Sequence, residues 1–264
     1  MPRLPVSAVV PTLNEEAALP ACLESLAWAD EVIVVDSGST DSTAALAEKT
    51  GARVVLRPFT TYGDQRNHGA SLARNDWVLC VDADERVSPE LAGEIESRLG
   101  AGPDRCGYRI PRITTFAGAV IRHCGWQRDR VLCLYDRRRG AWDPRLVHER
   151  VRLEGEAGDL GAPLHHHTYR DLGSYADKSR RYAELGAREL HQAGRRSGPA
   201  ALLLLPAARF LKMYVLNRGF LDGMPGLVLC VIAAYGVFVK YARLWELDRS
   251  RIDARVAKGE STWQ

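Results

Sequence analysis

The chain has 264 residues, of which 46% are hydrophobic and 26% are charged, so it carries enough apolar surface for a full globular core. No internal repeat and no segment of low complexity is evident, which excludes a repeat protein and favours one large domain, alone or with an appendage. The formal net charge is only +3 at pH 7, but it is distributed unevenly.

Positive charge is concentrated in the second half of the chain. Residues 122–152 contain nine Arg and four acidic residues, and residues 178–218 contain nine basic and two acidic residues. This excess indicates an anionic partner, whether phospholipid, sugar phosphate or nucleic acid, unless the charges only solvate a helical face. We do not expect nucleic acid, because the chain lacks a recognised nucleic-acid module and exposed aromatic residues interleaved with the basic ones.

Cysteine usage and the first residues indicate a cytoplasmic protein. The six cysteines form no CxxC pair and several lie in apolar runs, as expected for reduced, buried side chains. The opening residues, MPRLPVSAVVPT, lead directly into a strand without a charged segment followed by a cleavable apolar stretch. We therefore expect no secretory signal.

The first hundred residues alternate strand and helix patterns. The segment EVIVV is continuous in apolar residues, as a strand buried on both faces should be. Such alternation predicts a mainly parallel sheet covered by helices, in which ligands bind beyond the carboxyl ends of the strands. The expected strands are 6–10, 31–35, 53–56 and 77–81, and the expected helices begin at Asn14, Ser42 and Gly63.

The pattern changes after Pro103. Up to about Gly161 it predicts a mixed sheet with loops, and residues 172–193 then have helical spacing. The most apolar segment, 199–247, contains a run of fourteen residues that is shorter than the roughly 20 needed to span a bilayer. We expect an interfacial or re-entrant helix pair rather than a membrane span, with a buried core helix as the alternative.

The tetrapeptide Asp82-Ala83-Asp84-Glu85 directly follows the strand WVLCV. Two carboxylates separated by one residue at a strand end can face one divalent cation, and Mg²⁺ or Mn²⁺ prefers oxygen ligands of this kind. Such an ion neutralises the charge of a departing diphosphate. The alternative is a helix-capping turn before Ser88, which would account for one of the two Asp.

Two further polar motifs follow strands. Asp36 ends EVIVV, where its carboxylate can accept a hydrogen bond from a base N–H while the next turn presents backbone N–H groups to anions. Ser39 and Asp41 can instead cap the following helix. The motif PTLNE, which contains Pro11 and Asn14, ends the first strand in the same way.

In order and separation, VVPTLNEE, VVDSGSTDST and GDQRNHGASLARNDWVLCVDADE resemble the donor-site motifs of family 2 glycosyltransferases over roughly the first 150 residues. The resemblance implies the GT-A fold, a Rossmann-like α/β fold with a mixed, mainly parallel sheet flanked by helices. It implies a catalytic domain at 1–170, with a nucleotide-sugar half at 1–100 and an acceptor half at 101–170. A helical, membrane-associating extension would occupy 171–264, and the cofactor would be a divalent cation, Mg²⁺ or Mn²⁺.

The same resemblance assigns roles to individual residues. Arg66 would reach the donor base or phosphate, Asp82 the ribose or metal, and Asp84 the metal itself. The nucleoside pocket would be lined by Pro11, Asn14, Glu15 and Asp36, with Asp36 facing the base. A structural role is the alternative for Arg66, because an arginine on a helix usually lies in solvent.

An attacking hydroxyl needs a general base, because it is a poor nucleophile at neutral pH. In the family an acidic residue follows the metal motif at about the distance of Glu149, here in the order HE in place of the commoner ED, so His148 or Glu149 faces the acceptor. Asp143 is the second candidate base. In the alternative interpretation, Glu149 pairs with Arg150 or Arg152 on a surface strand.

Three consecutive histidines, His165, His166 and His167, follow the mixed-sheet region. Adjacent strand residues point to opposite faces, so His165 and His167 share one side and His166 faces the other. Many GT-A enzymes have a late histidine ligand, and resemblance in the residues that follow places His166 in that role. Three His without a neighbouring Cys make a structural zinc site unexpected.

The second half, through HTYRDLGSYADKSRRYAELGA and RFLKMYVLNRGFLDGMPGLVLCVIAAYGVFVKYARLWEL, resembles bacterial lipopolysaccharide-core glucosyltransferases. This implies inverting transfer of a hexose from a nucleotide sugar, with a UDP-sugar favoured, to a hydroxyl of the inner core. The enzyme would be cytoplasmic and peripherally associated with the inner face of the cytoplasmic membrane. A polyprenyl phosphate is the alternative acceptor, and a non-catalytic nucleotide-sugar-binding membrane protein is the alternative from another class.

Overall fold

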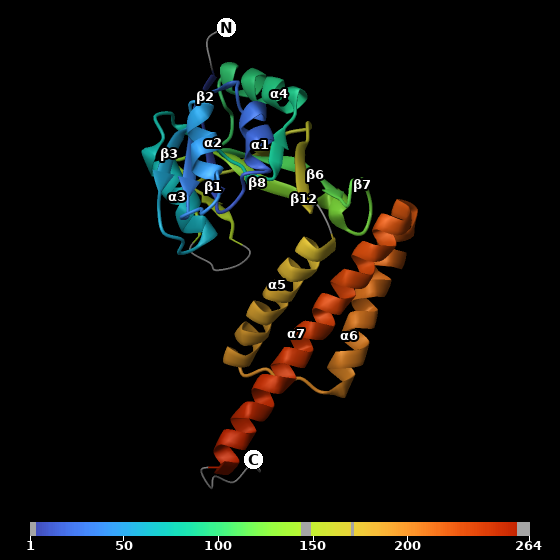
Figure 1. Ribbon diagram of the computed structural model, residues 1–264. Coiled ribbons are helices and arrows are strands. Elements are labelled where there is room, and N and C mark those ends of the chain that lie inside the picture. The colour runs from blue at the N-terminus through green and yellow to red at the C-terminus, as the bar shows by residue number, and fades with distance from the viewer. Residues whose placement is uncertain (1–3, 144–148, 170–171, 258–264) are drawn as a thin grey trace. The chain divides into compact units, whose positions relative to one another are not determined.

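The computed structural model describes residues 4–143, 149–169 and 172–257. The chain divides into two compact units (Figure 1). The sheet unit comprises residues 1–114 and 128–168, and the helical unit comprises residues 115–127 and 169–264. Each unit is described by itself below.

The sheet unit is built on a mixed sheet whose strands run in the order β3-β2-β1-β4-β8-β6-β12-β5. The first four strands in this order are parallel, whereas β4 and β8, and β8 and β6, pair in antiparallel fashion. This mixed sheet flanked by helices confirms the predicted fold class. The strands are β1 (Leu4–Thr12), β2 (Ala29–Asp36), β3 (Arg53–Leu56), β4 (Trp77–Cys80), β5 (Glu85–Val87), β6 (Gly107–Phe116), β8 (Arg130–Asp136), β11 (Ala157–Asp159) and β12 (Leu164–Tyr169), with the separate pair β9 (Gly140–Trp142) and β10 (Val151–Leu153).

Four helices belong to the sheet unit: α1 (Leu19–Ser25), α2 (Thr43–Lys49), α3 (Tyr62–Leu72) and α4 (Pro89–Gly100). Two of them have side-chain N-caps, because Thr61 accepts a hydrogen bond from the Asp64 N–H and Ser88 accepts one from the Leu91 N–H. The helix expected to begin at Asn14 begins instead at Leu19. The reason is local: Asn14 has a φ of 55°, in the left-handed region, so the chain turns there before helix can form.

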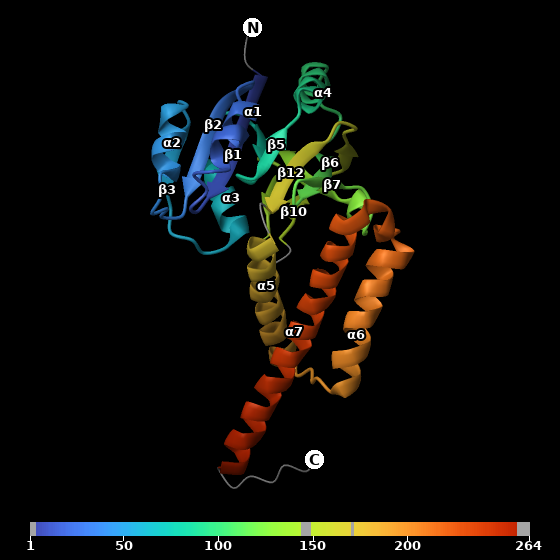
Figure 2. The same cartoon turned by 45° about the vertical axis from the view of Figure 1, so that its right-hand side comes forward.

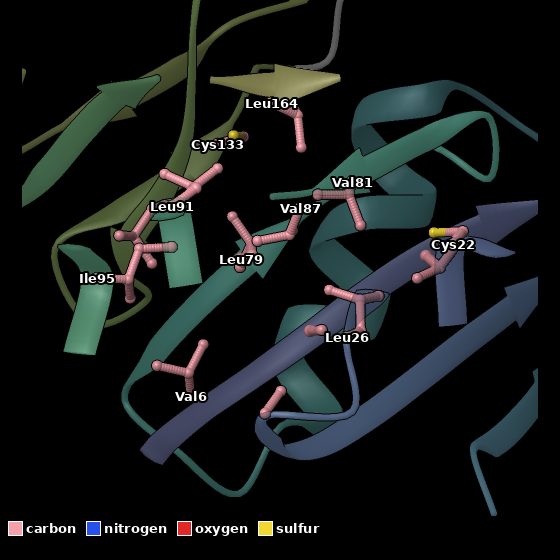
Figure 3. Close-up of a cluster of buried hydrophobic side chains, with 14 of the residues drawn as sticks. Val6, Cys22, Leu26, Leu79, Val81, Val87, Leu91, Ile95, Cys133 and Leu164 are labelled. Atoms are coloured by element: carbon pink, nitrogen blue, oxygen red, sulfur yellow. The ribbon is translucent and has the colours of Figure 1, made fainter. Parts of the chain in front are cut away.

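The core lies on both faces of the sheet because β1 is buried on both. Alternate residues such as Val6 and Val10 pack with α1, α2 and α4, whereas Val9 packs with α3. Figure 3 shows the first of these clusters, where Leu26, Leu79 and side chains from α4 point toward one another. Gly69 allows α3 to lie close against the sheet, since a Cβ there would collide with Val9. All six cysteines are buried and unbridged, as their spacing predicted.

The helical unit contains three long helices, and α5 and α6 flank α7 in both views (Figures 1 and 2). A π-helical turn, η2, and a 3-10 turn, η3, connect α6 to α7. Two segments, Pro199–Leu216 and Gly219–Arg249, are long and apolar enough to cross a membrane, by length and composition. The elements are β7 (Ala119–Ile121), η1 (Trp126–Arg128), α5 (Leu172–Gln192), α6 (Pro199–Leu211), η2 (Lys212–Leu216), η3 (Gly219–Asp222) and α7 (Gly223–Ala257).

Candidate active site

The polar motifs meet at the carboxyl edge of the parallel strands. In the register of β1 and β2, Pro11 lies opposite Val35 and Thr12 lies opposite Asp36. Strand β4 runs parallel on the other side of β1, and the Val81 N–H donates a hydrogen bond to the Val9 carbonyl just before Asp82. The three motif strands therefore end at one edge, as parallel strands must.

Asp36 is buried and organises the loop that follows it. Its Oδ2 accepts hydrogen bonds from the backbone N–H groups of Gly38 at 3.0 Å and Ser39 at 2.8 Å, and its Oδ1 accepts one from the Thr12 hydroxyl at 3.0 Å. Gly38 has a φ of 96°, a conformation that favours glycine. The carboxylate is thus fixed at the strand end by its own loop.

Asn14 joins the first motif to the second. Its backbone N–H donates to Ser39 Oγ at 2.8 Å, and its Oδ1 accepts from the Thr40 N–H at 2.8 Å. The neighbouring Glu15 N–H donates to Thr43 Oγ1 at 2.8 Å. These bonds hold the loops after β1 and β2 together, so Asn14, Glu15 and Asp36 lie on adjoining loops.

Arg66 links two distant carboxylates. Its Nη2 donates to Asp82 Oδ1 and its Nη1 donates to Glu149 Oε1, both at 2.6 Å, and its guanidinium stacks over the Trp142 ring at 4.5 Å from the ring centroid. Arg66 is buried, so the solvent-exposed structural role is wrong. Burial alone would lower the pKa of Arg66, but Asp82 and Glu149 outweigh it and raise that pKa. Burial has the largest single influence on Asp82 and raises its pKa, but Arg66, together with His166 and Arg112, lowers the pKa of that carboxyl below its usual value.

The neighbours of Arg66 explain how it reaches Glu149. The Asn67 side chain exchanges two hydrogen bonds of 2.9 Å with the backbone of Trp142, donating to its carbonyl and accepting from its N–H. This pair fixes β9 against α3. Gly63 on α3 leaves room for the Asp143 carbonyl, which a Cβ would meet at 2.5 Å. Strand β9 therefore places Trp142 directly over Arg66.

Asp143 is hydrogen-bonded to Arg150, the residue next to Glu149. Its N–H donates to the Arg150 carbonyl at 2.9 Å, and its Oδ1 accepts from the Arg150 N–H at 3.1 Å, so the two residues close a loop. Arg152 lies 3.9 Å from Asp143 Oδ2, while Glu149 pairs with Arg66 across the site. The candidate His148 lies outside the described residues.

Asp84 and His166 form a second pair of side chains at this end of the sheet. His166 Nε2 lies 3.3 Å from Asp84 Oδ2, and the His167 N–H donates to the Asp84 carbonyl at 2.8 Å, which sets the position of β12 against the Asp84 loop. His166 lies opposite Glu85 in the antiparallel register of β12 and β5, and His165 lies opposite Arg86. The strand alternation therefore singles out His166 as the histidine beside Asp84.

A divalent cation is the cofactor that the motif implies, and the donor set fits it in part. Asp84 supplies a carboxylate oxygen and His166 an imidazole nitrogen at one place, which are ligands that Mn²⁺ accepts. Among the described residues, no three His, Cys, Asp or Glu side chains are grouped so as to hold a metal ion alone. An ion here needs further ligands, which a diphosphate and water supply.

Comparison with known proteins identifies the family. The profile described as "Glycosyl transferase family 2" matches residues 7–119. A lipopolysaccharide core biosynthesis glycosyltransferase, LpsC, from Rhizobium meliloti is 31% identical over 259 residues, which cover 92% of this chain and 95% of the relative. The chain belongs to glycosyltransferase family 2. It is therefore a glycosyltransferase with the GT-A fold, as its motifs predicted.

A second relative and a solved structure are also similar to this chain. A glycosyltransferase of Rickettsia felis is 30% identical over 278 residues, covering 98% of this chain and 95% of the relative. A crystal structure of glucosyl-3-phosphoglycerate synthase from Mycobacterium tuberculosis, in complex with Mn²⁺, UDP and phosphoglyceric acid, is 29% identical with a TM-score of 0.36 and covers 41% of this chain and 43% of that one.

Two further residues lie at the site: Glu85, to which the sequence motif assigned no role, and Arg112, which lies outside the motifs. Glu85 is buried, and it accepts hydrogen bonds from the Asp82 N–H at 2.9 Å and from Arg112 Nη1 at 3.3 Å. Burial, and next the charge of Asp82, raise the pKa of Glu85 to about 7. The period-two alternation of β5 carries the signal, because Glu85 lies on the same side as the core residue Val87.

Proposed function

We propose that this glycosyltransferase moves a hexose from a nucleotide-diphosphate sugar, with UDP as the favoured nucleotide, to a hydroxyl of a cell-envelope glycan such as the lipopolysaccharide inner core. Transfer proceeds with inversion at the anomeric carbon. The relationship to LpsC along nearly the whole chain supports the acceptor class. The convergence of the donor motifs at one sheet edge supports the donor class.

The donor side of the site is formed by Arg66 and by the loops after β1 and β2, which are hydrogen-bonded to each other. Asp36, fixed by its loop, presents a carboxylate edge to the base, and the Asn14 loop forms the wall beside it. Asp82, whose side chain is 40% exposed, faces the ribose. Asp84 and His166 would hold the divalent cation, which when bound neutralises negative charge on the diphosphate.

Glu149 is the proposed general base. The acceptor hydroxyl passes its proton to the carboxylate as its oxygen attacks the anomeric carbon from the face opposite the diphosphate, and the bond to the nucleoside diphosphate breaks. Arg66 orients Glu149 and shares its positive charge between that residue and Asp82. Asp143 is less suited to this role, because its carboxylate already accepts a hydrogen bond from the Arg150 N–H.

The observation that carries this proposal is the Arg66 bridge, which puts a carboxylate from the acceptor half within two hydrogen bonds of the donor motif. A hydroxyl acceptor requires such a carboxylate. A polyprenyl phosphate acceptor does not, because its attacking oxygen is already anionic.

The test is Glu149→Gln, which keeps the shape of the side chain and removes its basicity. We expect kcat for sugar transfer to fall by about 10²- to 10⁴-fold with an unchanged KM for the donor. Glu156→Gln is the matched control, because the Glu156 side chain is 81% exposed and belongs to the same unit. Near-normal turnover of Glu149→Gln would favour the polyprenyl phosphate acceptor and reject the hydroxyl mechanism.

The proposed location is the cytoplasm, at the inner face of the cytoplasmic membrane. Support comes from the acceptor class, since a core glycan is built on a lipid, and from the apolar helices of the helical unit. Cell fractionation tests it: the protein should sediment with inner membranes and be digested by protease only when the cytoplasmic face is open.

A further inference from the structure

Helices α6 and α7 expose apolar side chains that none of the described residues of the helical unit covers. Only 6% of the apolar window in the α6 segment and 17% of that in the α7 segment are buried. Exposed apolar side chains follow α6, the connecting turns and the first half of α7: Leu203, Leu204, Leu211, Val215, Leu216, Phe220, Leu221, Met224, Val231, Tyr235 and Phe238. A patch of this extent on a soluble surface marks an interaction site.

Exposed cations lie beside these apolar residues. Arg209 and Lys212 lie at the end of α6, and Arg218 lies in the turn that follows it. Arg195 and Arg196 precede the first turn of α6 and are also exposed. Apolar side chains flanked by cations match the chemistry of an anionic phospholipid surface, where acyl chains lie under negatively charged head groups.

The position of helix α5 limits how the apolar surface of α6 and α7 can contact a membrane. It packs along α7 over the length of the apolar hairpin: Gly236 of α7 lies against Ser179, Lys240 lies against Gly186, and Asp248 pairs with His191 Nδ1 at 3.3 Å. The residues just before α6 lie beside the same part of α7, because the Ser197 N–H donates a hydrogen bond to Asp248 at 3.3 Å.

The outer face of α5 carries charged side chains along this length, beside the exposed Tyr182 and Leu185. Its exposed residues include three cations and two acids, namely Arg180, Arg181, Arg188, Asp177 and Glu189. If α6 and α7 crossed a bilayer, these charges would enter the hydrocarbon layer beside them. That arrangement is strongly unfavourable.

The turn between α6 and α7 gives a second, independent constraint. Asp222 in this turn has a side chain that is only 4% exposed, and its carboxylate accepts hydrogen bonds from the backbone N–H groups of Arg122 at 3.1 Å and His123 at 2.8 Å. The Cys124 N–H also donates to the Asn217 carbonyl at 3.2 Å. The turn is thus tied to residues 122–124 of the same unit and cannot lie on the far side of a membrane from them.

We infer that the helical unit docks in one leaflet of an anionic phospholipid bilayer, with α6 and α7 lying along the membrane surface, apolar side chains among the acyl chains and α5 facing water. The Asp222 contacts keep the hairpin turn on the side from which the protein binds. The inference deepens the proposed membrane location, and it is independent of which sugar is transferred.

Vesicle flotation tests the docking face, using the full chain and vesicles of phosphatidylcholine with phosphatidylglycerol. Leu204→Glu combined with Leu216→Glu changes side chains that are 66% and 77% exposed, so the fold should survive. We expect vesicle partitioning to fall by about a hundredfold, because two leucine side chains that would leave water on binding are replaced by charged ones. The matched control is Leu172→Glu with Leu185→Glu, two exposed leucines on α5, which should float like the unaltered chain.

Labelling distinguishes docking from spanning. The six native cysteines are buried, so Arg218→Cys in the turn and Arg196→Cys before α6 each provide one reactive thiol. A membrane-impermeant maleimide added outside the vesicles should label both positions. Labelling of Arg218→Cys only by reagent trapped in the lumen would overturn the inference and establish a span.

Two other results would also overturn it. Equal flotation of the α6 pair and the α5 control would remove the apolar face from membrane binding. A stable dimer that Leu204→Glu with Leu216→Glu dissociates, without vesicle binding by the unaltered chain, would assign the face to a second copy. Neither assay contains a nucleotide sugar. A negative result would therefore reject membrane docking alone, whereas sugar transfer by the Glu149 mechanism is tested by Glu149→Gln.

Discussion

Arg66 and Arg138 each join two carboxylates in the sheet unit, but at opposite edges of the sheet. Arg66 bridges Asp82, just beyond the carboxyl end of β4, to Glu149. Arg138 bridges Asp76, just before the amino end of β4, to Asp136 at 2.8 and 2.7 Å. The Arg66 side chain is 9% exposed and that of Arg138 is 61% exposed.

The two arginines differ in position and burial, and these differences support the proposed role of Arg66 in the site. At the carboxyl edge, Arg66 is enclosed by Trp142 and the Asp82 loop, so its charge acts through little solvent. At the amino edge, Arg138 is hydrated, and ion pairs of that kind contribute little to stability. Similar residue types thus serve different purposes according to which end of the strands they meet.

The largest expected effect is at Asp84, on the carboxyl edge. Asp84→Ala should lower metal-dependent sugar transfer by about a thousandfold, because it removes a carboxylate ligand and the charge neutralisation that depends on it. Thermal unfolding should be nearly unchanged, since the Asp84 side chain is 23% exposed and outside the core. Asp76→Ala is the matched change at the amino edge and should retain transfer. Full activity of Asp84→Ala in excess chelator would remove the cation from the mechanism.

The second-largest expected effect is at Arg66, for which Arg138 is the matched residue. Arg66→Met should lower kcat/KM by about a hundredfold, because Asp82 and Glu149 then face each other without the cation that orients them. It should also lower the free energy of unfolding by about 2 kcal/mol, since two partly buried carboxylates lose their partner. Arg66→Lys should restore little, because an ammonium group lacks the planar fork that reaches both carboxylates.

Arg138→Met is the control for this pair, measured by the same kinetics and by urea unfolding. It should leave kcat/KM within about twofold and change the free energy of unfolding by less than about 1 kcal/mol. Equal losses for the two arginines would show that Arg66 acts only in folding and would contradict its place in the site.

The carboxyl edge was predictable from sequence because parallel strands bring their ends together. Asp36, Asp82 and the first-strand motif each follow an apolar run, so their proximity needs only the order of the strands. The Arg66 contact with Glu149 was not predictable. It joins residues 83 positions apart and depends on the hydrogen bonds between Asn67 and Trp142 that fix β9 against α3. No local periodicity encodes such a contact.

In the helical unit, too, the contacts between distant segments could not be predicted from the sequence. The run at 226–239 was expected to be interfacial, re-entrant or buried, and composition alone leaves these open. The pairing of Asp248 with His191 and the burial of Asp222 place polar groups along and at the end of the hairpin. The proposed docking of this unit rests on such contacts between distant segments, and these contacts depend on tertiary packing.

The Asn67 contact gives a smaller effect that sharpens the comparison. Asn67→Ala removes both hydrogen bonds to Trp142, so β9, which places Trp142 over Arg66, should be held less firmly against α3. We expect about a tenfold lower kcat with donor KM unchanged, because a small misplacement of reacting groups is costly. Asn75→Ala is the matched amide at the amino edge, where Asn75 Nδ2 donates to Asp30 and Ser7. Steady-state kinetics should show a loss only for Asn67→Ala, and the same loss in both would contradict a positioning role.

The smallest effect is the pH dependence of Asp136, the structural counterpart of Asp82. The Arg138 side chain lowers the pKa of Asp136 more than burial raises it, so the carboxylate is more acidic in the folded chain than in the unfolded one. The stabilisation is therefore complete above the unfolded pKa of about 4 and is lost as pH falls through the lower folded pKa. Relative to the unaltered chain, Asp136→Asn should cost about 1 kcal/mol at pH 7. Urea unfolding at pH 7 and pH 3 should show the cost shrinking at the lower pH, whereas exposed Glu96→Gln on α4 should show no such change. A cost that stays constant between the two pH values would mean that Asp136 contributes through packing, and the contrast between the two edges would then rest on position alone.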